Sequence, residues 1–82
     1  MKKIGTVAHY YGHVGVAIVE LTGKLAVGDK VKFEGGKNEF EQTVGSMQIE
    51  HKDISSAKKG DVVGLKVDEK VSEGVDVCLV EE

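Results

Sequence analysis

The chain has 82 residues, of which 40% are hydrophobic and 30% are charged, and its net charge is −3 at pH 7. A chain this short forms one domain, here residues 1–82, and removes only about 60 to 65% of its unfolded surface from water, which disfavours a large enclosed substrate pocket. No apolar run approaches the roughly 20 residues that cross a bilayer, so we expect no membrane association. The first residues also lack an apolar signal core, and we expect a cytoplasmic protein.

The lysine and cysteine content further narrows the class of protein to which the chain could belong. All eleven cationic residues are lysines, so the chain lacks the guanidinium fork that grips phosphate or guanine with two hydrogen bonds. Its acidic balance also opposes undirected attraction to nucleic acid. Cys78 is the lone cysteine, whereas secreted domains of this size more often contain several disulfides. Its apolar, strand-like surroundings predict a buried structural role.

The first half of the chain has the pattern of β-strands. Residues 4–11 are rich in β-branched and aromatic side chains, and residues 14–21 are apolar on both faces, as expected of a strand enclosed in a barrel. Residues 31–34 and 39–44 alternate between polar and less polar side chains. The glycine-rich segment 35–38 between them predicts a hairpin rather than a phosphate loop, because it is flanked by two strands and not by the start of a helix.

The second half continues with short strands. Gly45 interrupts the alternation, which resumes with Met47 and Ile49 on one face, so we expect a bulge or a barrel corner there. Residues 54–58 could form at most one helical turn, and residues 62–67 and 75–80 supply the last strands. Six or seven short strands without a long helix predict an all-β fold, a small closed antiparallel barrel.

Two Gly-Asp dipeptides mark the corners of this predicted barrel. Gly28-Asp29 and Gly60-Asp61 each precede a strand. Glycine can adopt the positive φ that a tight turn requires, and the aspartate carboxylate can accept a hydrogen bond from a nearby backbone amide. We therefore interpret these four residues as structural turns and not as functional carboxylates.

The ordered motifs resemble a known family. The chain contains Gly-x-Leu-x-Val-Gly-Asp-x-Val at 23–31, Val-x-Ser-Met at 44–47 and Ala-x-x-Gly-Asp-x-Val-Gly-Leu at 57–65. This set resembles the second domain, a β-barrel, of translational GTPases such as elongation factor Tu. The whole chain is similar to small stand-alone proteins described as translation elongation factor-like. The resemblance implies a non-catalytic binding module that contacts RNA, either a tRNA end or the ribosome.

Several activities of the larger factors are not expected. The chain lacks the Gly-x-x-x-x-Gly-Lys-Ser/Thr loop, so we expect neither nucleotide binding nor GTP hydrolysis. Its serines have no recognisable base and orienting acid, so no catalytic residue is predicted. His9 and His13 are four residues apart, a spacing that suits metal ligands on a helix but not at a strand end, so we predict no metal site and no cofactor.

Two groups of residues form the candidate RNA-binding surface. Aromatic and imidazole rings gather where the first strand ends, and such rings can stack on unpaired bases; alternatively, one of the tyrosines fills the end of the barrel while the histidines are solvated. The resemblance adds polar residues matching the strand that helps hold the tRNA acceptor end. The candidates are His9, Tyr10, Tyr11, His13, Gln48, Glu50, His51 and Lys52.

Two functions therefore remain open from the sequence. The family resemblance favours a translation-associated module whose partner is RNA or a translation-related protein. The acidic charge favours a protein-interaction or accessory barrel that docks on a GTPase or a larger enzyme. Similar barrels also resemble the small C-terminal domain of collagenase-like peptidases, which supports the accessory role.

Overall fold

The structure, a computed structural model, describes residues 2–37 and 39–80. Asn38, the last residue of the predicted 35–38 turn, lies outside the described residues. The elements within the described ranges are all β-strands: β1 (Lys2–Tyr11), β2 (Val16–Leu21), β3 (Leu25–Ala26), β4 (Lys30–Glu34), β5 (Phe40–Thr43), β6 (Met47–Ile49), β7 (Lys52–Ile54), β8 (Ser56–Ala57), β9 (Val62–Lys66) and β10 (Asp76–Leu79). This part of the chain accordingly holds no helix that could span a bilayer.

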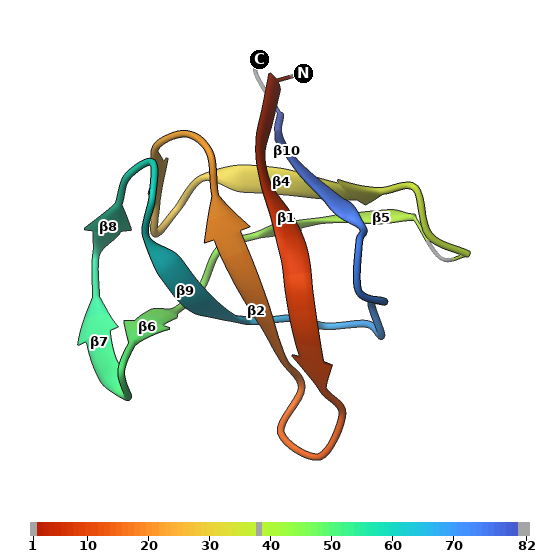
Figure 1. The fold of residues 1–82 in the computed structure, drawn as a ribbon, viewed down its shortest axis with the longest axis horizontal. Coiled ribbons are helices and arrows are strands. Elements are labelled where there is room, and N and C mark those ends of the chain that lie inside the picture. Colours follow the sequence, from red (N-terminus) through yellow and green to blue (C-terminus); the bar gives the residue numbers. More distant parts are fainter. Residues whose placement is uncertain (1, 38, 81–82) are drawn as a thin grey trace.

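Eight of these strands form one curled antiparallel sheet in the order β5-β4-β10-β1-β2-β9-β6-β7, and β3 pairs with β8 in a separate two-stranded ribbon. Figure 1 shows β1 and β2 crossing the front of the molecule, β4 and β5 on one side, and the β6–β7 hairpin on the other. The β1 strand pairs with both β2 and β10 and carries a register shift in each ladder. Such bulges bend a strand and increase its twist, which helps the sheet to curl.

The all-β prediction is confirmed, but the predicted closed barrel of six or seven strands is wrong. The sheet is a half-barrel whose edge strands are β5 and β7. Beside the β5 edge, the side chain of Gln42 stands in for a missing backbone ladder: its Nε2 donates to the Lys66 carbonyl at 2.8 Å, and its Oε1 accepts from the Asp68 amide at 2.8 Å. We call this pair of hydrogen bonds the Gln42 bridge.

The segment predicted as a possible helical turn is extended instead. Residues 52–54 form β7 and residues 56–57 form β8, with a bend at Ser55 between them. Ile54 pairs with Met47 of β6, and Ala57 pairs with Leu25 of β3. Cross-strand pairing therefore decides the conformation of this segment, and strands so short carry too few residues for a recognisable alternation.

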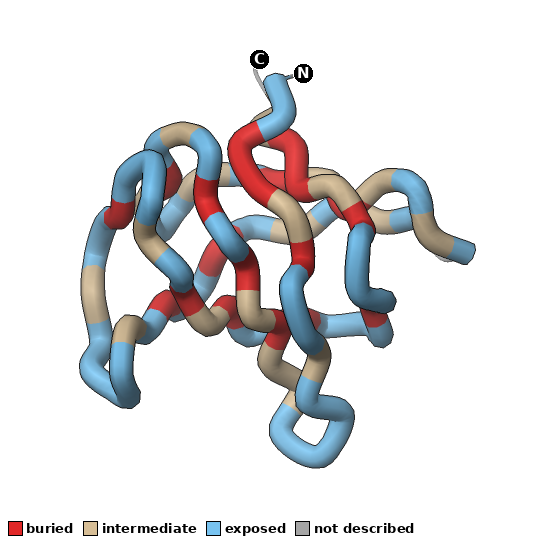
Figure 2. The backbone as a smooth tube through the Cα atoms, viewed as in Figure 1, coloured by how far each residue is buried: buried red, intermediate tan, exposed pale blue. Residues whose placement is uncertain are grey.

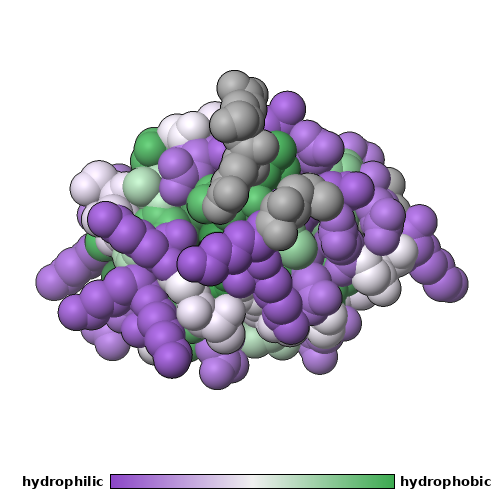
Figure 3. All heavy atoms as spheres, turned by 90° about the horizontal axis from the view of Figure 1, so that it is seen from above, coloured by the Kyte–Doolittle hydropathy of each residue, from purple (hydrophilic) through white to green (hydrophobic). Residues whose placement is uncertain are grey.

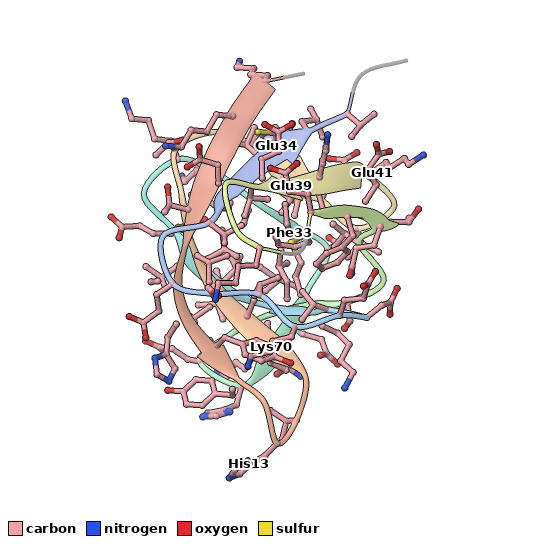
Figure 4. All side chains as sticks on the ribbon, turned by 90° about the vertical axis from the view of Figure 1, so that its right-hand side faces the viewer. His13, Phe33, Glu34, Glu39, Glu41 and Lys70 are labelled. Atoms are coloured by element: carbon pink, nitrogen blue, oxygen red, sulfur yellow. The ribbon has the colours of Figure 1, made fainter. Side chains whose placement is uncertain are left out.

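The core lies inside the curl of the sheet and is apolar. Buried residues alternate along most strands with exposed or half-buried ones, as the red and lighter stretches of Figure 2 show. Phe33 of β4 is fully buried and stacks on Phe40 of β5, with 4.9 Å between ring centroids. Figure 4 shows Phe33 pointing into the interior. Seen from above Figure 1, the surface is mostly hydrophilic, with smaller hydrophobic areas near its centre (Figure 3).

The two Gly-Asp corners have the same local geometry. Gly28 and Gly60 have φ values of 98° and 94°, which favour glycine because a Cβ would be strained there. Asp29 Oδ2 accepts a hydrogen bond from the Ala26 amide at 3.0 Å, and Asp61 Oδ2 accepts one from the Lys58 amide at 3.0 Å. Each aspartate thus ties the start of its strand to the residue three positions earlier.

Candidate binding groove

An open groove of about 850 Å³ lies on the outer face of the sheet, across β2 and β9 and beside the β6–β7 hairpin. In Figure 1 this is the region between β2 and the β6–β7 hairpin, with β9 between them. The lining residues come from five segments: Tyr11, Val14, Val16, Ile18, Gln48, Ile49, Glu50, His51, Gly60, Asp61, Val62, Val63 and Gly64. We call this feature the β2–β9 groove.

The register of the strands explains why the groove is hollow. Gly64 of β9 lies between Ile18 of β2 and Gln48 of β6, on the outer face of the sheet. A Cβ at Gly64 would lie 3.3 Å from Val16 Cγ1 and 3.6 Å from Ile18 Cδ1. The missing side chain therefore lets Val16 and Ile18 approach the backbone at Gly64 closely, and these two side chains form an aliphatic floor.

The walls of the groove are unusually apolar for a free surface. Tyr11, Val14 and Val62 are 51%, 55% and 51% exposed. Single exposed apolar residues are ordinary, but a cluster of them around a concavity is typical of an interaction site. The outer face of β2 is thus apolar because it borders this groove, and not because a closed barrel encloses it.

The charged lining residues are both acidic. Glu50 and Asp61 are the carboxylates among the groove residues that the structure describes, and no lysine lines the groove. Asp61 uses one carboxylate oxygen to accept from the Lys58 amide. At the other end of the groove, Lys66 Nζ donates to the carbonyl of Val14. The groove therefore combines an apolar floor with negative charge at the end formed by Glu50 and Asp61.

The tip of the β6–β7 hairpin is held in a costly conformation. Glu50 and His51 have φ values of 51° and 66° and are the non-glycine residues with positive φ in the described ranges. A two-residue hairpin turn with both φ values positive normally takes Asn-Gly or a similar pair, because side chains with a Cβ lose roughly 1–2 kcal/mol per residue there. The chain therefore gives up stability at a point where two polar side chains border the groove.

Replacing the tip by the preferred turn pair tests this cost. The double variant Glu50→Asn/His51→Gly is expected to raise the free energy of unfolding by about 1 kcal/mol, since asparagine and glycine tolerate positive φ while glycine adds some entropy to the unfolded chain. Urea unfolding measures the change. His13→Gly, in a loop where that histidine has no positive φ, should not stabilise the fold. An unchanged urea midpoint for the double variant would show that the tip is not strained.

The residues predicted as a binding surface are only partly brought together. Tyr11, Gln48, Glu50 and His51 line the β2–β9 groove, although their segments are far apart in the sequence. The remaining predicted residues lie outside its lining.

The other four residues have separate surroundings. His9 Nδ1 lies 3.2 Å from Glu73 Oε2, and its ring meets Tyr11 edge-on at 4.4 Å. Tyr10 packs against the core and, with His13, borders a smaller hollow of about 270 Å³. Figure 4 shows His13 at the tip of the β1–β2 loop, away from the body of the sheet. Lys52 is exposed at the start of β7.

The residues predicted from the sequence do not include the apolar half of the groove, which consists of Val14, Val16, Ile18, Ile49, Val62, Val63 and Gly64. A usable signal was present, because residues 14–18 are apolar at both alternating positions. That pattern is compatible either with enclosure on both faces or with an apolar outer surface.

The remaining chemistry-bearing groups do not form a reactive centre in the described part of the chain. Burial raises the pKa of the Cys78 thiol, and the Glu34 and Asp76 carboxylates act in the same direction. The thiol is therefore protonated at neutral pH and a poor nucleophile. Within residues 2–37 and 39–80, no group of three or more His, Cys, Asp or Glu side chains could hold a metal ion.

These features define a small all-β half-barrel domain with an apolar groove on its outer face, and two solved structures share that fold. The C-terminal domain of a candidate U32 peptidase from Geobacillus thermoleovorans superposes with a TM-score of 0.91 at 22% identity, covering 98% of this chain and 93% of that domain. Its selenomethionine variant gives 0.90 at 22% identity, covering 95% and 99%. At this identity the likeness concerns the fold alone.

A relative that is similar in sequence is described as a protease. The chain is 43% identical over 81 residues to an uncharacterized protease of Methanocaldococcus jannaschii, and the match covers 98% of this chain and 20% of the relative. The chain thus spans about a fifth of the length of the curated relative that it matches. No protein-family model matches the chain.

The predicted kinship with translation elongation factor-like proteins is wrong, and with it the predicted RNA-binding role in translation. The similar proteins are a protease and the C-terminal domain of a candidate U32 peptidase. The motifs that suggested a translation factor are largely the two glycine-aspartate corners. In each corner the glycine adopts a positive φ and the aspartate carboxylate accepts a hydrogen bond from a backbone amide. Such corner chemistry follows from the geometry of a small barrel and does not specify its partner.

Proposed function

We propose that this chain is a non-catalytic accessory domain that acts by docking on a larger enzyme of the peptidase type. The observation that carries the proposal is the 43% identity to one fifth of the M. jannaschii protease, across 98% of this chain. A segment that is a small part of a protease and folds as a compact half-barrel is well placed to bind or position, while the chemistry lies elsewhere in the protein.

The physical character of the groove supports the same proposal. Its apolar floor would be poorly solvated when free, and covering it with protein would remove exposed side chains such as Tyr11 and Val62 from water. The acidic charge of the chain, −3, suits a protein partner better than a polyanion.

A chimeric protease that contains this chain tests the docking. The matched fifth of the M. jannaschii protease is replaced by this chain, and amide hydrogen exchange of the chain is compared between the chimera and the free protein. Docking is expected to slow exchange on one face of the half-barrel, because buried backbone amides open less often. A chimera with an unrelated β domain of similar size serves as the control for general effects of tethering. Identical exchange in the chimera and the free chain would overturn the proposal.

A further inference from the structure

We propose that the β2–β9 groove is the docking face, and that its occupant is a polypeptide segment in which apolar side chains stand next to lysine or arginine. This inference rests on the proposed function for the identity of the larger partner, to which the segment would belong. It assigns to that partner a defined chemistry, and to this chain a defined surface.

The floor and walls of the groove favour apolar side chains on the occupant. Val16 and Ile18 lie close over the backbone of Gly64 and form the floor, and half-exposed Tyr11 and Val62 border the same concavity. A groove of about 850 Å³ is large enough for several side chains. Aliphatic or aromatic anchors entering it would be removed from water together with its walls, which is the usual energetic centre of a protein interface.

The charged residues at the margin of the groove indicate which charged side chains the occupant carries. Glu50, at the hairpin tip, and Asp61, at the corner before β9, are both groove residues. Carboxylates beside an apolar floor favour cationic neighbours on the partner and repel acidic ones. An anionic ligand, such as a nucleic-acid backbone, would meet the unfavourable sign of charge at the end of the groove where Glu50 and Asp61 lie.

The strained hairpin tip supplies an independent reason to regard the margin as functional. Glu50 and His51 occupy positions with positive φ that asparagine and glycine would fill at lower cost. If the tip served only to connect β6 to β7, a cheaper pair would suffice. Its charged and imidazole side chains are instead presented at the groove.

A titration with short synthetic peptides tests the groove directly on the free chain. The probe alternates leucine and lysine, one matched peptide has glutamate for each lysine, and another has serine for each leucine. We expect the leucine-lysine peptide to shift the amide resonances of β9 and the β6–β7 tip and to bind at least about tenfold more tightly than either matched peptide. Absence of shifts at the groove, or equal binding of the acidic peptide, would overturn the proposal.

Variants with matched controls separate the apolar and ionic contributions. Val62→Ser is expected to raise the Kd of the leucine-lysine peptide by about tenfold, whereas Val27→Ser, also at an exposed valine but outside the groove, should leave it unchanged. Glu50→Lys should weaken binding about three- to tenfold at low salt and less at high salt, while Asp68→Lys, with the same change in charge outside the groove, should not. Equal effects of Val62→Ser and Val27→Ser would contradict the assignment.

The chimeric protease then separates this inference from the proposed function. Slowed amide hydrogen exchange at β2, β9 and the β6–β7 tip in the chimera would support both the docking and the groove as its site. Slowed exchange confined to another face would retain the docking but overturn the groove as its site. Peptide binding at the groove without any slowed exchange in the chimera would leave the groove assigned and overturn docking on the protease.

Discussion

Replacing Phe33 by alanine is expected to lower the free energy of unfolding by about 3–5 kcal/mol. Phe33 is fully buried, the largest such side chain, and its ring stacks on Phe40 at 4.9 Å. Truncation removes both the buried apolar surface and the ring contact, and it leaves a cavity that a close-packed interior fills only in part. The whole domain is expected to be stable by only about 4–12 kcal/mol, so the variant would lose a large share of its stability.

Urea or thermal unfolding followed by circular dichroism measures this loss. Phe33→Leu should cost distinctly less than Phe33→Ala, and it keeps the prediction testable if the alanine variant does not fold. Phe40→Ala is the matched control, because this ring is only half-buried and should cost less than Phe33. Equal losses for Phe33→Ala and Phe40→Ala would contradict the placement of the core.

The smallest substitution with a large expected effect is Gly5→Ala. A Cβ at Gly5 would lie 2.8 Å from Val19 Cγ1 and 2.9 Å from the carbonyl oxygen of Glu20. Gly5 pairs with both β2 and β10, so the backbone of β1 cannot move away from one neighbour without disturbing the other. We expect a loss of about 1–3 kcal/mol from overpacking.

Gly45→Ala provides the control for this prediction. A Cβ at Gly45 would meet nothing within 4 Å, and this glycine has no positive φ. The added methyl group restricts the unfolded chain without a clash, so the free energy of unfolding should stay unchanged or rise by up to about 1 kcal/mol. The free energies of unfolding of the two variants, obtained from denaturant curves measured side by side, should therefore move in opposite directions or differ by more than about 1 kcal/mol. Similar free energies would refute the close approach at Gly5.

Strand content was predictable because alternation is a local property. Residues 4–11, 31–34 and 62–67 have side chains that alternate or branch at Cβ, and these segments form β1, β4 and β9. The ribbon of β3 and β8 could not be found in this way, since each strand is two residues long and is fixed by pairing across the molecule.

Closure of the sheet was not predictable from the same patterns. Whether the outer edge of β5 is joined to the segment at Lys66 and Asp68 by a backbone ladder or by one side chain depends on three-dimensional geometry, and Gln42 has no special mark in the sequence. Apolar residues on both faces of β2 suggested enclosure, whereas the outer pair, Val16 and Ile18, borders a groove.

The partner was harder to predict than the fold. Recognition of the Gly28-Asp29 and Gly60-Asp61 corners was physically sound, but corner chemistry constrains backbone direction and not ligand identity. The groove itself could be predicted only in part, because Tyr11, Glu50 and Val62 come together through the curl of the sheet, and separation along the chain hides their proximity.

The Gln42 bridge also marks the line along which local opening of the domain is expected to be easiest. Two hydrogen bonds from one half-buried side chain span this line, whereas backbone ladders of six and five residue pairs join β2 to β1 and to β9. Parting at the bridge breaks two hydrogen bonds, fewer than unzipping a long ladder such as β1–β2 or β2–β9, so low-energy fluctuations should begin there. Such a fluctuation would briefly wet the interior near Val67 while β2, β9 and their groove remain rigid.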